Sequence, residues 1–504
     1  EADRRTPPST PEADVLIAHD LGTSGDKASL HALDGTVLGS ATVSYATAYG
    51  TRAEAEQNPE EWWRAVCEAT RHLLEKTGTS PSAVTGICVG GTMMCVVLVD
   101  HTGQPLRPAM IWADQRAAAE ADELSAGFGD EEAYRITGNR LAATYNVPKL
   151  MWLQRHEPDV VARAYRAIGH KDYVNARLTG IIATDTTDAS STAAYDLASG
   201  SWSDEVITAS GVESRLFPLV VESTRVLGPL TRAAAEELGL TTSTVVVAGG
   251  GDGPMAAAGA GCVLPDTPGY VCLGTSAWYS RTTVRPVLDP LRRSFTLSHV
   301  VPGAFVPTAT TQAGAGTLEW LRDAIAPGTS VADLVAEGLA AEAASTGLFF
   351  LPYLTGERTP WWNPLATGVM AGLRRHHGRA EMVRATLEGV AFGLALCMEP
   401  LVLPDEPVDV VGGGAASDGW LQLFADIWAR PVRRRSVTAG ATSLGVAITG
   451  LVGLGELDFS AAPSLSTVEC EVLPSSRVDE YQDHKERFVA AYLAAAPWFE
   501  GTTA

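Results

Sequence analysis

Apolar residues near the start of the chain gather in three short runs, at residues 15–18, 27–33 and 37–45. Asp34 and Gly35 separate the second run from the third and are typical of a tight hairpin turn. The pattern therefore predicts three antiparallel strands. Residues 59–74 follow with the apolar spacing of a helix, for which Asn58 is the expected N-cap.

Two further apolar runs, at residues 87–90 and 96–99, read as buried strands. Three strands, a helix and two more strands, followed by helical patterns to residue 178, predict an α/β domain. Three predicted strands end in glycines, at 90–91, 249–251 and 412–414. Glycine lets a backbone approach a ligand closely, and open α/β sheets bind ligands at this end of their strands. Tight turns without a ligand are the alternative.

The tetrapeptide Leu-Gly-Thr-Ser occurs twice, at residues 21–24 and 273–276, half the chain apart and each time after an apolar run. A unit repeated at this spacing predicts two related domains that face each other, although four common residues can also recur by chance. We expect a disordered tail over residues 1–13, an N-terminal domain over 14–243 and a C-terminal domain over 244–504.

Composition narrows the class of protein. Apolar residues make up 46% of the chain and the net charge is −22, which predicts large cores and disfavours nucleic acid and anionic membranes as partners. The seven cysteines are scattered without CxxC spacing, as expected for reduced buried thiols. No signal-like segment is visible, and the uncharged stretch 436–455 holds five glycines, which favours a packed helix over a membrane span. We expect a cytoplasmic protein, with a homodimer as one possible assembly.

Two acidic residues stand where predicted strands end. Asp20 is followed by a turn rich in amides and hydroxyls, the groups that a phosphate chain with Mg²⁺ requires. The second such turn has Cys272 at the matching place. Asp252 follows the apolar run 245–248 and three glycines, a setting that suits a general base for an attacking hydroxyl. The alternative is that Asp252 caps a helix.

Other chemistries lack their usual motifs. Residues 251–256 fit the dinucleotide pattern G-x-G-x-x-A, but Pro254 lies in the turn and no acid follows about 20 positions on. The chain contains no P-loop motif, no H-E-x-x-H and no G-x-S-x-G. A nicotinamide-dependent oxidoreductase is therefore a weak alternative.

In this order, the motifs resemble those of the FGGY carbohydrate kinases, and within that family xylulokinases are the most similar. The likeness runs from Val15 to about Phe499. The blocks that carry it are residues 20–24, 56–59 with 62–63, 111–116, 148–156, 171–173, 249–252, 273–276, 351–360, 368–389, 412–414 and 420–422. The resemblance implies the actin–hexokinase architecture, here two RNase H-like α/β domains around a central cleft, and a reaction between ATP–Mg²⁺ and a hydroxyl of a small sugar or polyol.

The resemblance also implies roles for single residues. Asp252 matches the catalytic base and Asp20 the acid directed at Mg²⁺. The positions that match nucleotide contacts are Thr23, Gly274, Thr275, Gly314, Gly413, Gly414 and Ser417. The positions that match substrate contacts are Met93, Met94, Trp112, Trp278 and Asp252 itself.

The chain departs from the xylulokinase pattern at two positions. Xylulokinases typically have histidine where this chain has Met94, and asparagine where it has Gly253. Losing an imidazole and an amide changes how sugar hydroxyls are recognised. The expected substrate is therefore a pentulose such as xylulose, but the sequence does not specify which sugar. A non-catalytic actin-like protein that binds nucleotide is the alternative, and the presence of both Asp20 and Asp252 argues against it.

Two other blocks predict structural roles. Trp62 and Trp63 are expected to pack on a helix face. Glu357 and Arg358 are expected to form an internal ion pair that holds a loop.

Overall fold

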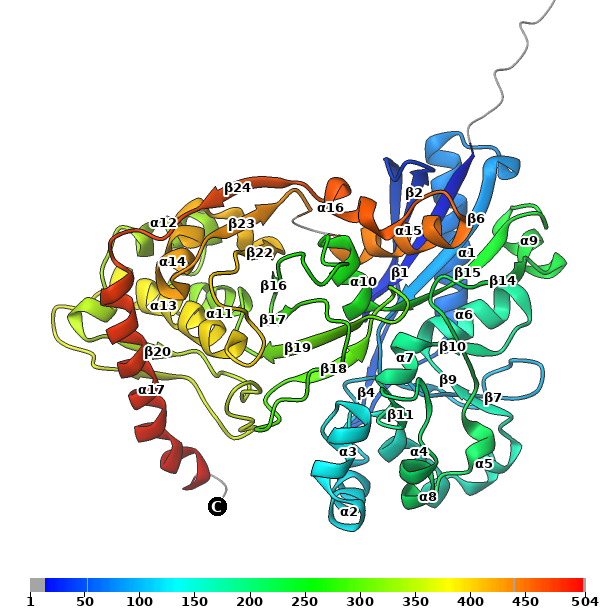
Figure 1. The fold of residues 1–504 in the computed structure, drawn as a ribbon, viewed down its shortest axis with the longest axis horizontal. Coiled ribbons are helices and arrows are strands. Elements are labelled where there is room, and N and C mark those ends of the chain that lie inside the picture. Colours follow the sequence, from blue (N-terminus) through cyan, green and yellow to red (C-terminus); the bar gives the residue numbers. More distant parts are fainter. Residues whose placement is uncertain (1–13, 52, 438–439, 502–504) are drawn as a thin grey trace, which may run out of the picture. The chain divides into compact units, whose positions relative to one another are not determined.

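The computed structural model describes residues 14–51, 53–437 and 440–501, which form two compact units. Within this part of the chain, unit 1 comprises residues 14–259, 298–303 and 442–461, and unit 2 comprises the rest. Figure 1 gives the labels used below. The units divide the chain differently from the domain boundary expected at 243/244, because helix α10 (Asp252–Gly259) and the late helix α15 (Ala441–Leu454) both pack on the first sheet.

Unit 1 is built on a six-stranded sheet in the order β14-β15-β6-β1-β2-β3. Strands β1, β6 and β15 run parallel, while β2 and β3 continue from β1 as an antiparallel meander. The three antiparallel strands predicted at the start of the chain are therefore confirmed. The bounds are β1 (Val15–Leu21), β2 (Gly25–Ala32), β3 (Val37–Ser44), β6 (Val84–Gly91), β14 (Val226–Pro229) and β15 (Val245–Gly251).

Helix α1 (Pro59–Thr77) begins where the sequence predicts and runs three residues beyond the expected end at residue 74. The Asn58 side chain accepts a hydrogen bond from the Glu60 amide, and Gly78 ends the helix with a left-handed φ of 69°. Trp62 and Trp63 are both buried in the core of unit 1. The Trp62 indole donates to Gln57 Oε1 at 2.9 Å. Both tryptophans thus have the packing role expected of them.

Helix α15, orange in Figure 1, lies against β1 and β6. Its glycines make the approach possible, since a Cβ at Gly450 would lie 2.7 Å from the Cβ of Cys88 and one at Gly445 would lie 1.8 Å from the Met255 carbonyl oxygen. The predicted packed helix is confirmed over 441–454, while residues 438–439 lie outside the described chain. Among the described helices, none is both long and apolar enough to cross a membrane.

Unit 2 repeats the plan of unit 1. Its seven-stranded sheet has the order β18-β19-β17-β16-β22-β23-β24, with β16, β22 and β23 parallel. If the edge strands β14, β18 and β24 are left out, the five remaining strands of each sheet, numbered along the chain, have the order 3-2-1-4-5. The two RNase H-like domains expected from the resemblance are therefore confirmed. The bounds are β16 (Tyr270–Leu273), β17 (Ala277–Ser280), β18 (Phe295–Ser298), β19 (Phe305–Thr311), β22 (Val408–Val411), β23 (Val432–Arg435) and β24 (Val468–Val472).

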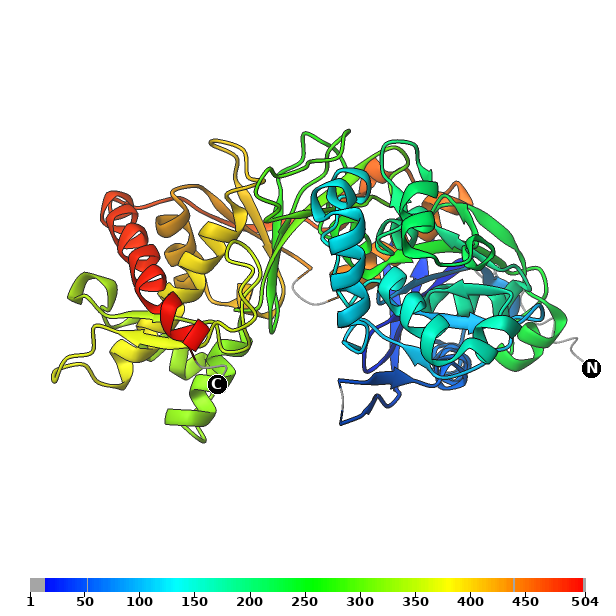
Figure 2. The ribbon, with the colours of Figure 1, turned by 90° about the horizontal axis from the view of Figure 1, so that it is seen from below.

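The core of unit 2 forms under the long helix α13 (Arg379–Met398). Figures 1 and 2 both show α13, in yellow, beside α17 (Val478–Gly501), in red. Phe392 of α13 packs against Phe488 of α17 with ring centroids 5.3 Å apart, and Arg384 donates to the Tyr481 hydroxyl at 2.8 Å.

The other helices of six or more residues are α2 (Ala118–Phe128), α3 (Asp130–Thr137), α4 (Asn146–His156), α5 (Pro158–Arg163), α6 (His170–Thr179), α8 (Asp204–Ser210), α9 (Arg232–Leu238), α11 (Gly316–Ile325), α12 (Val331–Leu339) and α14 (Asp418–Trp428). The short helix α7 (Thr186–Ser190) also bears on the site.

Candidate active site

The two acids singled out from the sequence lie at one edge of the sheet of unit 1. Asp20, near the end of β1, is in register with Gly90 of β6. Gly251, the last residue of β15, is in register with Gly91 of β6, and Asp252 follows directly. Because all three strands run parallel, their carboxyl ends meet here, and the two acids flank the end of β6 on either side.

A bulge in β15 aims Asp252 away from the regular path of the strand. The register of β15 shifts between Val247 and Gly250, and Gly249 has a φ of +70°. A Cβ at Gly249 would lie 1.8 Å from the Val89 carbonyl oxygen, so only glycine fits this approach. The Gly251 amide then donates to Thr187 Oγ1 at 2.8 Å, which anchors the turn that carries Asp252.

Asp252 is the first residue of α10 and remains partly exposed. Its Oδ1 accepts a hydrogen bond of 2.8 Å from the Gly253 amide, so a role at the helix start and a chemical role are compatible. Removal from water, followed by the negative charge of Asp20, raises the pKa of Asp252 to about 7. A carboxylate with this pKa is a stronger base than an ordinary aspartate, and its partial exposure leaves it within reach of a ligand.

Asp20 is buried, and burial raises its pKa. The Ser443 hydroxyl, from α15, donates to Asp20 Oδ2 at 2.9 Å. Among the described residues, no group of three or more His, Cys, Asp or Glu side chains could hold a metal ion by itself. A protein that supplies one or two carboxylates fits Mg²⁺ that is held mainly by phosphate oxygens and water.

The turn after Asp20 is held from several sides. Gln57 Nε2 donates to the Thr23 carbonyl at 2.7 Å, and the Tyr45 hydroxyl donates to the Gly22 carbonyl at 2.5 Å. The Trp112 indole donates to the Thr23 hydroxyl at 3.1 Å. These bonds hold in place the turn that is expected to meet phosphate.

Met93 and Met94 differ in burial and in backbone conformation. Met93 is buried and packs against the turn of Asp252, because a Cβ at Gly251 would lie 2.5 Å from the Met93 sulfur. Its expected contact with the sugar stays a prediction. Met94 is partly exposed, has a φ of +60°, and receives the Thr144 hydroxyl on its sulfur at 3.6 Å. The Thr144 hydroxyl also donates to the Trp112 carbonyl at 2.7 Å, which links two predicted substrate residues.

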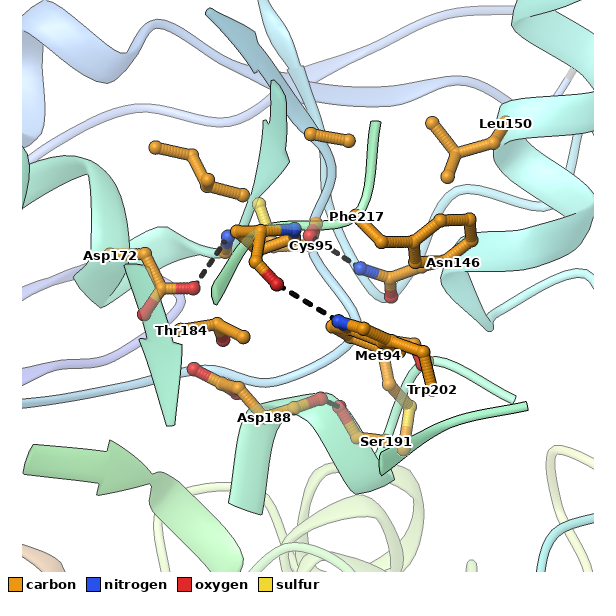
Figure 3. Close-up of a pocket in the computed structure, with 15 residues that line it drawn as sticks. Met94, Cys95, Asn146, Leu150, Asp172, Thr184, Asp188, Ser191, Trp202 and Phe217 are labelled. Carbon is orange, nitrogen blue, oxygen red and sulfur yellow. Dashed lines mark hydrogen bonds between the residues drawn. The ribbon is translucent and has the colours of Figure 1, made fainter. Parts of the chain in front are cut away.

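A small cavity lies behind Met94 (Figure 3). Met94, Asn146, Asp188 and Ser191 line it, and its volume of about 20 Å³ holds one water molecule. The Asn146 side chain donates to the Cys95 carbonyl at 2.9 Å, which braces the segment just after Met94. A cavity of this size is far too small for a sugar.

In unit 2, the second Leu-Gly-Thr-Ser turn forms a cradle with the loop after β19. The Ala315 amide donates to the Gly274 carbonyl at 2.8 Å, and the Gly316 amide donates to the Thr275 carbonyl at 3.2 Å. A Cβ at Gly314 would lie 2.6 Å from the Gly274 carbonyl oxygen. Three residues expected to contact nucleotide therefore meet at one place.

The loop 412–417 joins this cradle at the end of β22. A Cβ at Gly414 would lie 2.5 Å from the Leu273 side chain, whereas a Cβ at Gly413 would meet nothing within 4 Å. The Ser417 side chain accepts from the Trp420 amide and caps α14. Trp278, on β17, also belongs to unit 2, where its indole donates to the Tyr270 hydroxyl at 3.1 Å. Its role as a substrate contact stays a prediction.

Several supporting residues carry no signal in the sequence. Ser443 reaches Asp20 from 423 positions along the chain. Thr187 and Thr144 stand in segments without a motif. Their roles depend on contacts between distant segments, which no local pattern encodes.

Comparison with known proteins places the chain in a family. The FGGY family of carbohydrate kinases matches it in two parts, the N-terminal domain over residues 15–259 and the C-terminal domain over 269–454. Xylulose kinase of Escherichia coli strain K12 is 32% identical over 488 residues, which cover 96% of this chain and 99% of that protein. Gluconokinase of Bacillus subtilis strain 168 is 28% identical over 476 residues, 89% of each chain.

Among solved structures, the ligand-bound xylulose kinase from Lactobacillus acidophilus matches with a TM-score of 0.92 and 25% identity, covering 97% of this chain and all of that one. The matches extend over nearly the whole chain, both in sequence and in fold. The chain therefore belongs to the FGGY family of carbohydrate kinases, enzymes that phosphorylate sugars with ATP.

Proposed function

We propose that this kinase phosphorylates a hydroxyl of a pentulose or a closely related ketose or polyol, with Asp252 as the general base. The observation that carries this proposal is the pair of acids at the carboxyl edge of the sheet of unit 1, with Asp252 partly exposed at the end of a bulged strand. Xylulose is the reference substrate because the E. coli relative at 32% identity is a xylulose kinase.

The oxygen of the sugar hydroxyl attacks the γ-phosphorus of ATP, and Asp252 takes the proton of that hydroxyl. The bond from that phosphorus to the β-bridging oxygen breaks, and ADP leaves. A pKa of about 7 brings the carboxylate close to the operating pH, where a general base is most effective. The Thr187 bond to the Gly251 amide keeps the carboxylate in place during the transfer.

Each unit has a turn that we expect to contact the nucleotide. In unit 2, the cradle of Gly274, Thr275 and Gly314 and the loop with Gly413, Gly414 and Ser417 offer close backbone approach and hydroxyl groups for ATP. In unit 1, Thr23 offers a hydroxyl beside Asp20. Asp20 would hold Mg²⁺, which when bound neutralises charge on the phosphates.

In unit 1, Met94 and Trp112 would form part of the sugar pocket, with Met93 as a further expected contact. Trp278, in unit 2, stays an expected contact with the sugar. Met94 supplies a soft apolar contact where xylulokinases typically have histidine, so we expect weak recognition of D-xylulose itself. The gluconokinase relative makes an aldonic acid the second candidate. Against it, two cations around the Trp112 loop are already engaged: Arg116 pairs with Asp114 and Glu56, and Lys149 donates to three carbonyls.

The test is a turnover panel of pentuloses, hexuloses, polyols and gluconate, with ADP release measured in the presence of Mg²⁺. The proposal expects one ketose or polyol to exceed gluconate in kcat/KM. It is wrong if gluconate is the best substrate or if no compound raises ADP release above the rate without acceptor.

A further inference from the structure

Lys149, on α4, is a buried lysine without a carboxylate partner in the described part of the chain. Its side chain is fully buried. Its Nζ donates to the carbonyls of Met94 at 2.7 Å, Ile111 at 2.7 Å and Thr144 at 2.8 Å. An ammonium group has three donors, and these three bonds use all of them.

The three acceptors come from three separate segments of unit 1, and each segment presents a side chain to the proposed sugar pocket. Met94 is itself an expected sugar contact. Ile111 precedes Trp112, which is 40% exposed. Thr144 is partly exposed, and its hydroxyl contacts both the Met94 sulfur and the Trp112 carbonyl. The amino group of Lys149 and the Thr144 hydroxyl therefore connect the same three segments, the first from a buried position and the second from a partly exposed one.

Met94 needs such support more than an ordinary loop residue. Its φ of +60° lies in the left-handed region, which residues with a Cβ seldom adopt. Strained backbone of this kind persists only where the surroundings hold it in place. The bond of 2.7 Å from Lys149 to the Met94 carbonyl acts directly on the strained residue.

We infer that Lys149 is a positioning residue for sugar recognition, which sets the spacing of Met94, Trp112 and Thr144 without contacting the sugar. The inference rests on the proposed function, since it assigns a role within that same pocket. If Lys149 served only general stability, its loss would affect the KM for sugar and the KM for nucleotide alike.

The test compares wild type with Lys149→Met, which keeps most of the length of the side chain and removes all three donors. Lys76→Met is the matched control, because Lys76 also donates to a carbonyl, that of Ser40, but at an exposed site on α1. We expect Lys149→Met to raise the sugar KM by about tenfold or more, since small displacements of positioned groups cost up to about 100-fold. The ATP KM should stay within about twofold, the signature of a lost contact on one substrate alone.

Hydrogen exchange gives a readout that does not depend on turnover. In Lys149→Met, the backbone amides of three segments should exchange faster than in wild type: residues 92–95, 111–114 and 142–146. In Lys76→Met, their exchange rates should be unchanged. A folded Lys149→Met with unchanged sugar KM, or with equal rises in the sugar and ATP KM, overturns the inference. A wild-type protein that phosphorylates no acceptor would instead refute the proposed function, and unchanged exchange in the three segments would refute the role of Lys149 separately.

If Lys149→Met does not fold, Thr144→Ala decides the question. This variant removes the hydroxyl bonds to Met94 and Trp112 at a partly exposed position. A severalfold rise in the sugar KM, with the ATP KM unchanged, supports the claim that contacts among these segments position the sugar pocket. An unchanged sugar KM contradicts it.

Discussion

The indole nitrogen of Trp112 donates a hydrogen bond of 3.1 Å to the hydroxyl of Thr23, 89 positions earlier in the chain. Trp112 is the most exposed of the expected sugar contacts in unit 1, and Thr23 stands in the turn expected to meet phosphate. The bond therefore connects an expected sugar contact with an expected phosphate contact within unit 1.

This connection predicts energetic coupling between the two residues. A double-mutant cycle of Trp112→Phe and Thr23→Val, read as kcat/KM for the sugar, should show a coupling of about 0.5–1.5 kcal/mol, the range of a single hydrogen bond. Trp498→Phe is the control, because Trp498 is 71% exposed on α17 in unit 2. Effects of Trp112→Phe and Thr23→Val that add within about 0.3 kcal/mol would show the bond to be without consequence.

The role of Asp20 is tested by the metal dependence of turnover. Asp20→Ala should raise the Mg²⁺ concentration for half-maximal activity by roughly 10–100-fold, the loss typical when a group that orients a metal is removed. Asp34→Ala, an exposed aspartate in the β2–β3 turn, serves as the control. A folded Asp20→Ala enzyme with wild-type Mg²⁺ dependence would reduce Asp20 to a residue that ends a strand.

We expect Met94 to determine how the proposed sugar pocket recognises hydroxyl groups. Apolar contact discriminates by only roughly 10–200-fold, whereas a site that bonds a hydroxyl rejects analogues lacking it by about 10⁴. We expect Met94→His to raise kcat/KM for D-xylulose relative to the other members of a ketose and polyol panel. The argument fails if wild type already prefers D-xylulose, with kcat/KM at or above roughly 10⁴ M⁻¹s⁻¹.

Glu357 gives a prediction about pH and stability. It holds the loop before Gly314 by accepting bonds from the Thr311 hydroxyl at 2.6 Å, the Gln312 amide at 2.9 Å and the Arg358 amide at 2.6 Å. The expected ion pair with the Arg358 guanidinium does not form in the described chain, because backbone and hydroxyl donors occupy the carboxylate. Burial raises the pKa of Glu357 to about 7, from an ordinary 4.5.

Since the folded state binds this proton more tightly than the unfolded state, the contribution of Glu357 to stability is fully present below about pH 4.5 and is lost as pH rises through 7. The melting temperature of wild type minus that of Glu357→Gln should therefore fall between pH 5 and pH 8. A difference that is constant with pH, or that grows, would contradict the raised pKa of Glu357.

The local elements could be predicted from the sequence because each depends on neighbouring residues. The strands at 15–45, the helix capped by Asn58 and the duplicated Leu-Gly-Thr-Ser turn all follow from period and turn chemistry. Asp20 and Asp252 were visible as acids at strand ends. Ser443, Lys149 and the packing of α15 on unit 1 were not, because they depend on segments more than 35 positions apart meeting in space.

The difference between Met93 and Met94 also lay beyond the sequence. Adjacent residues after a strand usually point in different directions, but which one is buried depends on Gly251, which leaves room for the Met93 side chain. The left-handed backbone of Met94 has no marker in the sequence, because glycine is the residue that usually signals it.

The most direct measurement is single-turnover phosphoryl transfer by Asp252→Asn, with the best substrate of the panel. The amide keeps the shape of the side chain but cannot take the proton, so the transfer rate should fall by roughly 10²–10⁴ with ATP affinity and melting temperature nearly unchanged. Asp34→Asn, the exposed control, should retain the wild-type rate. A rate for Asp252→Asn within about threefold of wild type, far below the effect of losing a general base, would contradict the account.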